Sequence, residues 1–360
     1  MIARRGAVSR TKWAALIGSV LLVGAACAGT GATTAPGPTA NSVAATPNIV
    51  ASCACASPAE AAAAPSTTSS AATPAGSQTG MAGTVVAWGD DTAHQTDVPA
   101  GLSGVVAVAA GDSFSVALKS DGTVVAWGGN QGESALPVGL SDVKAISAGS
   151  GFTVALKSDG TVVGWGENAD GQTHPPAGLS GVVEISAGGT HTLALKGNGT
   201  IAAWGGDANG ETDVPAGLQH VIHVSAGYDY SLAVMSDGTV VAWGNKYPTD
   251  VATGVAKVPS GLGNVIAVSA GFSHNLVIKQ GGDVVSWGGN QDGETSVPSG
   301  LKAGAVAAGG NFSLALRPDG KVVAWGGNDS GQATVPADLS SVIAIDAGGS
   351  HALAIVAKGV

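Results

Sequence analysis

The sequence predicts an all-β fold, a seven-bladed β-propeller built from four-stranded antiparallel blades. Three observations predict it: an internal repeat, strand-like alternation within each repeat, and the overall composition. The chain has 360 residues, of which 57 are Gly, and it is 44% hydrophobic but only 11% charged. So much Gly with so little charge is typical of many short strands and tight turns rather than of long helices.

The repeat is marked by the pair Trp-Gly, which recurs at intervals of 39, 38, 39, 39, 44 and 38 residues. The seven tryptophans are Trp88, Trp127, Trp165, Trp204, Trp243, Trp287 and Trp325. A fixed period of this length indicates one supersecondary unit repeated along the chain. We interpret the tryptophans as structural residues that pack between neighbouring units. The alternative is that they form a row of aromatic rings on which carbohydrates stack.

Each unit contains three runs that alternate large apolar with small or polar residues, such as 105–111, 115–119 and 122–127. This alternation has the period of a strand. The turn Asp121-Gly122 joins the second and third runs and suits a tight hairpin, because both residues tolerate positive φ. A fourth run ends in Val98-Pro99, and proline belongs at a sheet edge because it cannot donate to a ladder. Each unit is therefore predicted to be a four-stranded meander.

The two ends of the repeat region are incomplete in complementary ways. The N-terminal unit starts at Gly83 with only its third and fourth runs, and the C-terminal unit stops after its first two, at 342–347 and 351–356. We expect the propeller to span residues 83–360. N- and C-terminal strands would share its seventh blade, which removes the open edges of a linear array.

The N-terminus is typical of an export signal. Its first dozen residues contain Arg4, Arg5, Arg10 and Lys12. An uncharged apolar run over 13–26 follows, too short for a comfortable membrane span, and small residues then precede Cys27. We expect residues 1–27 to be a signal peptide of the lipoprotein type, with Cys27 lipidated. The protein would then be held at the cell surface or in the periplasm. Plain secretion to the extracellular space and an uncleaved anchor are the alternatives.

Residues 28–82 are almost entirely Ala, Thr, Ser, Pro and Gly and carry one charge. Such a segment cannot bury enough apolar surface to offset chain entropy, so we expect a disordered tether. Cys53 and Cys55 lie within it without further metal ligands nearby. They are either incidental thiols or sites of an intermolecular disulfide.

The charge balance argues against a nucleic-acid partner. From residue 83 onward the chain has 24 of its 25 acidic residues and 11 of its 15 basic ones, a balance of about −13. Phosphate contacts come mostly from Lys and Arg. We therefore expect no nucleic-acid partner, membrane contact only through the N-terminal anchor, and a monomer.

The repeat units resemble the regulator of chromosome condensation (RCC) repeat. The resemblance rests on the segments Ala148–Lys157, Asp159–Gly166 and Asn168–Gln172, and all seven units over 83–360 share it. It implies a seven-bladed propeller. Units of about 39 residues are similar to those of secreted bacterial members such as the propeller-type β-lactamase inhibitory protein. Those inhibitory members carry exposed aromatic residues on the face loops. We look for them here in the slots two residues after the Ala-Gly glycine, which contain no aromatic residue.

The sequence offers no constellation for catalysis. His191, His274 and His351 occupy a slot that other units fill with Phe or Tyr, which indicates a packed ring rather than a proton carrier. Residues 83–360 contain no Cys for a nucleophile. Turns such as 168–171 superficially resemble calcium loops, but no bidentate Glu follows at the required distance. We expect no enzymatic activity, no cofactor and no metal.

Binding through loops on one propeller face is the function that remains. The 44-residue interval contains an insertion within 245–257, and insertions in repeat proteins often lie on the binding face. Tyr228, Tyr230, Tyr247 and Phe272 fall on adjacent units there and form our candidate patch. An extracellular protein is the expected ligand. A cell-wall or polysaccharide ligand is the alternative, and β-lactamase inhibition a further one.

Overall fold

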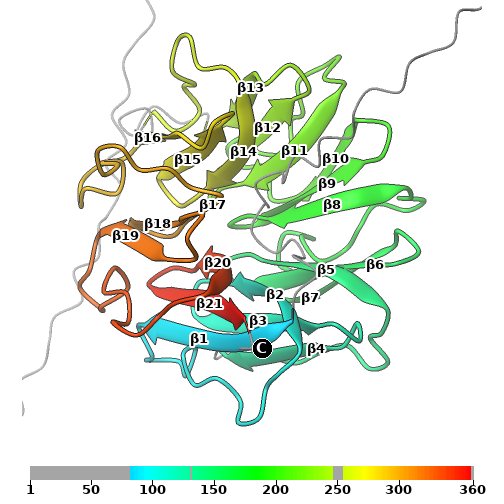
Figure 1. Ribbon diagram of the computed structural model, residues 1–360. Coiled ribbons are helices and arrows are strands. Elements are labelled where there is room, and N and C mark those ends of the chain that lie inside the picture. The colour runs from blue at the N-terminus through cyan, green and yellow to red at the C-terminus, as the bar shows by residue number, and fades with distance from the viewer. Residues whose placement is uncertain (1–81, 130–131, 246–253, 358–360) are drawn as a thin grey trace, which may run out of the picture. The chain divides into compact units, whose positions relative to one another are not determined.

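The computed structural model describes residues 82–129, 132–245 and 254–357. These ranges contain 21 strands and no helix. The strands form antiparallel sheets around a common axis (Figure 1). The candidate residue Tyr247, the lipidation candidate Cys27, and Cys53 and Cys55 lie outside the described residues. In the described part of the chain, no helix is long and apolar enough to cross a membrane.

Each repeat contributes three strands in succession. The first strands are β2 (Val105–Ala110), β5 (Val143–Ala148), β8 (Val182–Ala187), β11 (Val221–Ala226), β14 (Val265–Ala270), β17 (Ala305–Ala308) and β20 (Val342–Ala347). The second strands are β3 (Phe114–Lys119), β6 (Phe152–Lys157), β9 (His191–Lys196), β12 (Tyr230–Met235), β15 (His274–Lys279), β18 (Phe312–Leu316) and β21 (His351–Ala357). The third strands are β1 (Gly83–Gly89), β4 (Val124–Gly128), β7 (Val162–Gly166), β10 (Ile201–Gly205), β13 (Val240–Gly244), β16 (Val284–Gly288) and β19 (Val322–Gly326).

The prediction of four-stranded blades is wrong: six repeats form three-stranded units, and the fourth run forms turns. The backbone amide of Val98 donates to Thr96 O at 2.9 Å, and that of Leu102 donates to Pro99 O at 3.1 Å. The segment thus uses its amides internally, and Pro99 has none. Its apolar side chains Val98 and Leu102 still pack against the core.

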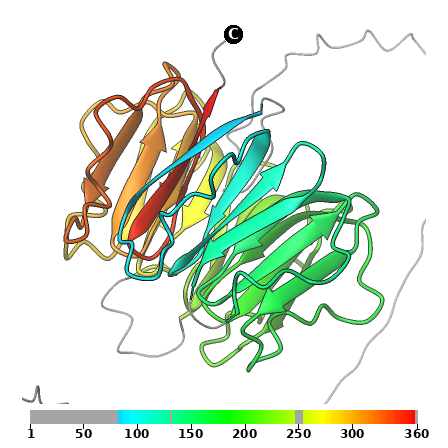
Figure 2. The same cartoon turned by 90° about the horizontal axis from the view of Figure 1, so that it is seen from below.

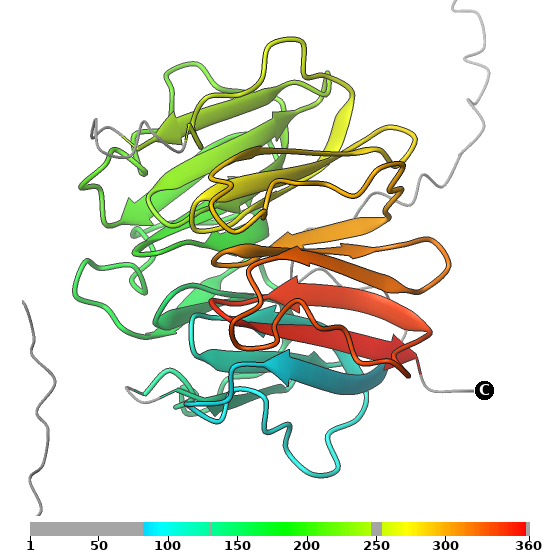
Figure 3. The ribbon, with the colours of Figure 1, turned by 90° about the vertical axis from the view of Figure 1, so that its left-hand side faces the viewer.

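A closing sheet combines strands from both ends of the described region. β1 pairs antiparallel with β21 over seven residues, from Gly83 opposite Ala357 to Gly89 opposite His351. Figures 1 and 3 show β1 (cyan) beside β21 (red), and Figure 2 shows the same neighbours from below. The start of the repeat region supplies one strand of this sheet, β1, and its end supplies two, β20 and β21. The fourth run that we expected after β1 is not a strand. A single pair, Gly83 opposite Val105, links the closing sheet to β2.

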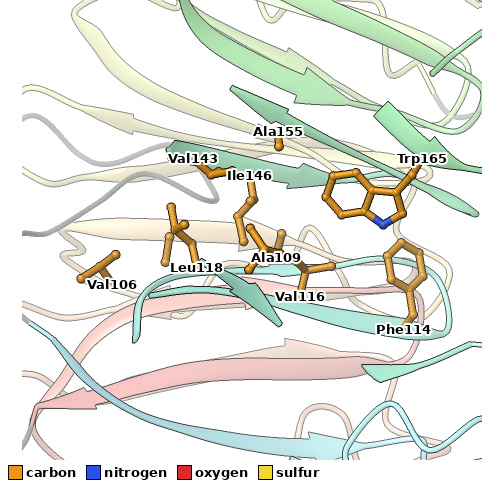
Figure 4. Packing of buried hydrophobic residues seen from close by; sticks show 11 residues of the cluster. Val106, Ala109, Phe114, Val116, Leu118, Val143, Ile146, Ala155 and Trp165 are labelled. Atoms are coloured by element: carbon orange, nitrogen blue, oxygen red, sulfur yellow. The ribbon is translucent and has the colours of Figure 1, made fainter. Parts of the chain in front are cut away.

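Neighbouring sheets pack against each other through their side chains, and their strands do not form one continuous hydrogen-bonded ladder. The core consists of seven apolar clusters, each shared by two adjacent sheets. Figure 4 shows one of them, in which Phe114 and Val116 of one sheet face Ile146 and Trp165 of the next. Another cluster joins the closing sheet to the first repeat through Leu353 and Trp127. The first strands also contact one another in order around the axis, from β2 through β20 and back to β2.

Candidate functional site

Seven short loops, each joining a first strand to a second strand, meet around the axis at one face. Each loop begins with an Ala-Gly pair, and all seven pairs line one axial pocket. The glycines are required by close approach: a Cβ on Gly149 would collide with Gly188 O of the next sheet. A Cβ on Gly188 would likewise collide with Gly227 O. A larger residue here would push the blades apart, so glycine sets the width of the pocket.

Backbone hydrogen bonds link these loops in a circle. The residue after each of the seven glycines donates its amide to a carbonyl of the next loop. The donor and acceptor pairs are Asp112–Ser150, Ser150–Gly188, Gly189–Gly227, Tyr228–Gly271, Phe272–Gly309, Gly310–Gly348 and Gly349–Gly111, at 3.1–3.4 Å. Because each loop is tied to its neighbour, the backbone from which the rim side chains project is held in place.

Two aromatic side chains occupy adjacent positions on this rim. Tyr228 and Phe272 are 42% and 39% exposed, and their ring centroids lie 5.0 Å apart with the planes tilted by 45°. Both line the axial pocket, whose volume is about 70 Å³. Tilted pairs at this distance have favourable quadrupole interactions, so the two rings act as one apolar surface.

The candidate patch is thus only partly assembled. The structure brings Tyr228 and Phe272 together, but Tyr230 is 1% exposed and is not available to a ligand. Its hydroxyl donates to His274 O at 2.9 Å, and burial raises the pKa of the phenol. Tyr230 begins a second strand, in the same slot as the buried Phe114 and Phe152, so it belongs to the core.

The three histidines in that slot are also buried. Their Nε2 atoms lie 2.9–3.0 Å from Ser Oγ atoms, as in the pair His191 and Ser231. Ser231 Oγ gives its proton to Glu211 O at 2.8 Å, so His191 Nε2 must be the donor to Ser231. His191 Nδ1 has no partner, which agrees with a neutral ring, and burial lowers the pKa of His191 to about 4. These imidazoles replace phenyl rings and have structural partners.

The seven tryptophans are 6–9% exposed, and each indole Nε1 donates to a backbone carbonyl of another unit. Trp204 Nε1, for example, donates to Gln172 O at 2.9 Å. Gln172 O also accepts the hydroxyl of Thr192, and Gln172 Oε1 accepts the amide of Asp170. One buried residue of each loop thus anchors the tryptophan that follows it.

The repeat architecture agrees with the comparison to known families. A sequence model of the regulator of chromosome condensation (RCC1) repeat matches residues 105–132, 143–172, 182–211, 221–246, 265–294 and 305–332. Each match starts at or within one residue of a first strand and runs beyond the third, as the structure divides the chain. The chain is an RCC1-type repeat propeller.

Solved structures agree with this RCC1-type fold. Prp20p from Saccharomyces cerevisiae is 16% identical, with a TM-score of 0.67 over 79% of this chain and 94% of that one. Human WBSCR16 is 19% identical, with a TM-score of 0.61 over 76% of this chain and 100% of that one. The ectodomain of the Physcomitrella patens receptor kinase CR4 is 22% identical, with a TM-score of 0.55 over 67% of each chain. At these identities the likeness concerns the fold alone. A comparison with curated proteins gives no match.

The RCC1-type propeller carries one exposed group of potential metal ligands within the described ranges. Asp91, His94 and Asp97 lie close together, with His94 Nδ1 2.9 Å from Asp97 Oδ2. Asp91 Oδ1 accepts the amide of Thr96 at 2.9 Å. The calcium-like turn at 168–171 is similar, since Asn168 Oδ1 accepts the amide of Thr173 at 3.0 Å. These oxygens stabilise their own turns.

Sequence reasoning missed two carboxylates near the axis. Asp112 is exposed on the rim of the axial pocket. Asp346 is buried deeper, in a second cavity of about 70 Å³ that is also lined by Ser147, Ser186 and Ser225. A signal was available for both: Asp112 follows the Ala-Gly pair, and Asp346 stands where other repeats have Ser or Ala.

Proposed function

We propose that this protein is an exported, lipid-anchored, non-catalytic propeller that binds a protein ligand through the face carrying the axial rim. The exposed pair of Tyr228 and Phe272 is the observation that carries the proposal. Aromatic side chains are enriched at the centres of protein interfaces, where they bury large area with little loss of side-chain freedom. A rim whose backbone is tied by hydrogen bonds orders the loops that carry these rings before binding, which lowers the entropic cost of association.

Structural relatives support a protein ligand. The structure of Prp20p was described together with its binding properties to Gsp1p and histones, and a second structure shows Kap60 bound to yeast RCC1 (Prp20). A propeller of this type is therefore a suitable scaffold for protein recognition. These relatives do not identify the ligand of this chain, because the ligand depends on the residues of the rim and not on the shared fold.

The non-catalytic assignment is supported by the use of the histidines. His191, His274 and His351 are buried and donate through Nε2 to neighbouring serines, so they cannot reach a substrate at the rim.

The anchor is supported by the sequence 1–27 ending at Cys27. Incorporation of a palmitate analogue by the wild type but not by Cys27→Ala is the expected result, and equal labelling would contradict the anchor.

The decisive experiment for binding compares two double variants in capture of extracellular proteins. Tyr228→Ala/Phe272→Ala removes the aromatic pair and is expected to abolish capture. Val183→Ala/Ile222→Ala is the matched control, because both residues are exposed apolar side chains at the opposite ends of the first strands. Equal capture by both variants would refute the proposed face.

A polysaccharide ligand is the second candidate, and the same aromatic pair favours it because sugar rings stack on exposed aromatic faces. A glycan array with the wild type and Tyr228→Ala/Phe272→Ala separates the two: binding to a glycan that the variant loses would replace the protein-ligand proposal.

Adding the propeller to a class A β-lactamase with a chromogenic substrate tests the inhibitor alternative. We expect undiminished hydrolysis, and inhibition would identify the partner.

A further inference from the structure

Charges are segregated between the two faces of the propeller. We call the side with the axial rim and the loops after Trp-Gly the loop face, and the side with the Asp-Gly hairpins the hairpin face. The exposed carboxylates in loops of the loop face include Asp91, Asp112, Glu167, Asp170, Asp207, Asp292 and Asp329. Of the nine Lys and Arg residues in the described ranges, Lys257 alone is not at the hairpin end of a strand.

Three of the basic residues on the hairpin face pair with a nearby carboxylate. Lys119 lies 3.0 Å from Asp121, Arg317 lies 3.1 Å from Asp319, and Lys302 contacts Asp283 at 2.6 Å. Positive and negative charges therefore offset one another there. On the loop face Lys257 is the one Lys or Arg among the described residues, so the exposed carboxylates outnumber the basic groups there and give a negative potential, which attracts basic surfaces.

Within this negative face, the axial pocket combines a carboxylate with the aromatic pair. Asp112 belongs to the first repeat, whereas Tyr228 and Phe272 belong to the fourth and fifth, so in a ring of seven they lie on opposite sides of the axis. Asp112 is the one charged residue that lines this pocket. A Cβ on Gly349 would collide with Asp112 Oδ1, so the carboxylate rests against that glycine. Partial desolvation there raises the pKa of Asp112.

A primary ammonium group has the chemistry that this pocket complements. It donates a charge-assisted hydrogen bond to a carboxylate and is attracted to aromatic faces. The pocket volume of about 70 Å³ accommodates the end of one long side chain and no folded segment. The methylene groups of a lysine would contact Tyr228 and Phe272, while its ammonium group would face Asp112.

We propose that the protein ligand presents a basic surface to the loop face and inserts one lysine side chain into the axial pocket, between Asp112 and the aromatic pair of Tyr228 and Phe272. This inference rests on the proposed function and specifies the chemistry of the partner. The surrounding carboxylates of the loop face steer and orient the basic surface, and the pocket selects the lysine.

The test uses the full chain and two fluorescein-labelled peptides: one built from Gly-Ser-Lys units, and its fully Nε-acetylated form. Fluorescence anisotropy is measured at physiological salt. We expect acetylation to weaken binding by about tenfold or more, because the neutral amide cannot pair with Asp112. Asp112→Asn is expected to weaken binding of the lysine peptide about tenfold, and Phe272→Leu about threefold.

Asp329→Asn is the matched control, because it removes one exposed carboxylate from the loop face away from the axial pocket. We expect it to weaken binding less than about twofold, since a screened charge at a distance contributes little. Equal losses for Asp112→Asn and Asp329→Asn would overturn the proposal that a lysine binds in the axial pocket. Equal binding of the acetylated peptide would overturn it as well. If the pocket fails while Tyr228→Ala/Phe272→Ala still abolishes protein capture, the proposed function stands. If that capture is unaffected, the function itself fails.

Discussion

At the residue scale, Asp346 differs from its equivalents in the other repeats. Ser147, Ser186, Ser225 and Ser269 each accept a backbone amide of the next first strand through Oγ, at 2.9–3.0 Å. Asp346 does the same through Oδ2, which accepts the amide of Ala110 at 2.8 Å. The carboxylate thus makes the contact between the closing sheet and the first repeat, but burial raises its pKa to about 7.

Asp346→Asn is expected to stabilise the protein at alkaline pH. Since the folded pKa lies above the unfolded value of 3.8, ionising Asp346 costs stability, and this cost develops as pH rises from about 4 to 7. Asn keeps an oxygen for the Ala110 amide without a charge. We expect a gain on the order of 2 kcal/mol at pH 8 and little or none at pH 4, by denaturant unfolding at both. Equal effects at the two pH values would contradict the assignment.

Replacing His191 with Phe is expected to reduce the acid sensitivity of folding. The folded pKa of about 4 lies below the unfolded value of 6.5, so the neutral ring stabilises the fold above pH 6.5, and this contribution is lost as pH falls toward 4. Ser231 keeps its bond to Glu211 O. Between pH 7 and 5 we expect the variant to lose about 1–2 kcal/mol less than the wild type. His174→Ser, at an exposed histidine, should follow the wild type.

At the element scale, each third strand is tied to another unit by its tryptophan. In β10, Trp204 places its ring in the core between sheets and donates to Gln172 O. Trp204→Phe keeps an aromatic ring, loses volume and leaves the carbonyl with one fewer donor. We expect a loss of about 2–3 kcal/mol in the free energy of unfolding. Tyr228→Phe is a control at an exposed aromatic ring, and a loss of similar size there would show that the method does not resolve the buried bond.

The elements show what a sequence can and cannot predict. Three strands per repeat follow from alternation and from Asp-Gly turns such as Asp121-Gly122, whose glycine has a φ of 80°. The fourth strand was wrongly predicted because a short apolar segment ending in proline packs its side chains without joining a ladder, as Val98 does. The sequence placed Tyr228 and Phe272 in one candidate patch, as the structure does, but it also placed the buried Tyr230 there. Tyr228 and Tyr230 are two residues apart in sequence, yet the former lies in a rim loop and the latter starts a buried strand.

At the scale of the whole propeller, the structure depends on closure between the two ends of the repeat region. Six interfaces join units that are consecutive in sequence, but the seventh joins residues more than 200 apart, as in the bond from Ala110 to Asp346. Contacts of such sequence separation form late in folding, because the chain must first close a very long loop. The closing sheet is therefore the place where the propeller would open first.

A disulfide across the closing sheet tests this directly. Thr84 of β1 lies opposite Val356 of β21, so Thr84→Cys/Val356→Cys places two sulfurs on the same side of the sheet. Cys27, Cys53 and Cys55 are replaced by Ser to prevent competing pairs. We expect oxidation to form an intramolecular bond, seen as faster migration on a non-reducing gel, and to stabilise the propeller by about 3–5 kcal/mol, since the closed loop is long. Thr84→Cys/Ala357→Cys is the register control, because neighbouring residues of a strand point to opposite faces. Equal cross-linking of both pairs, or bonds only between molecules, would show that the two ends are not paired in this register.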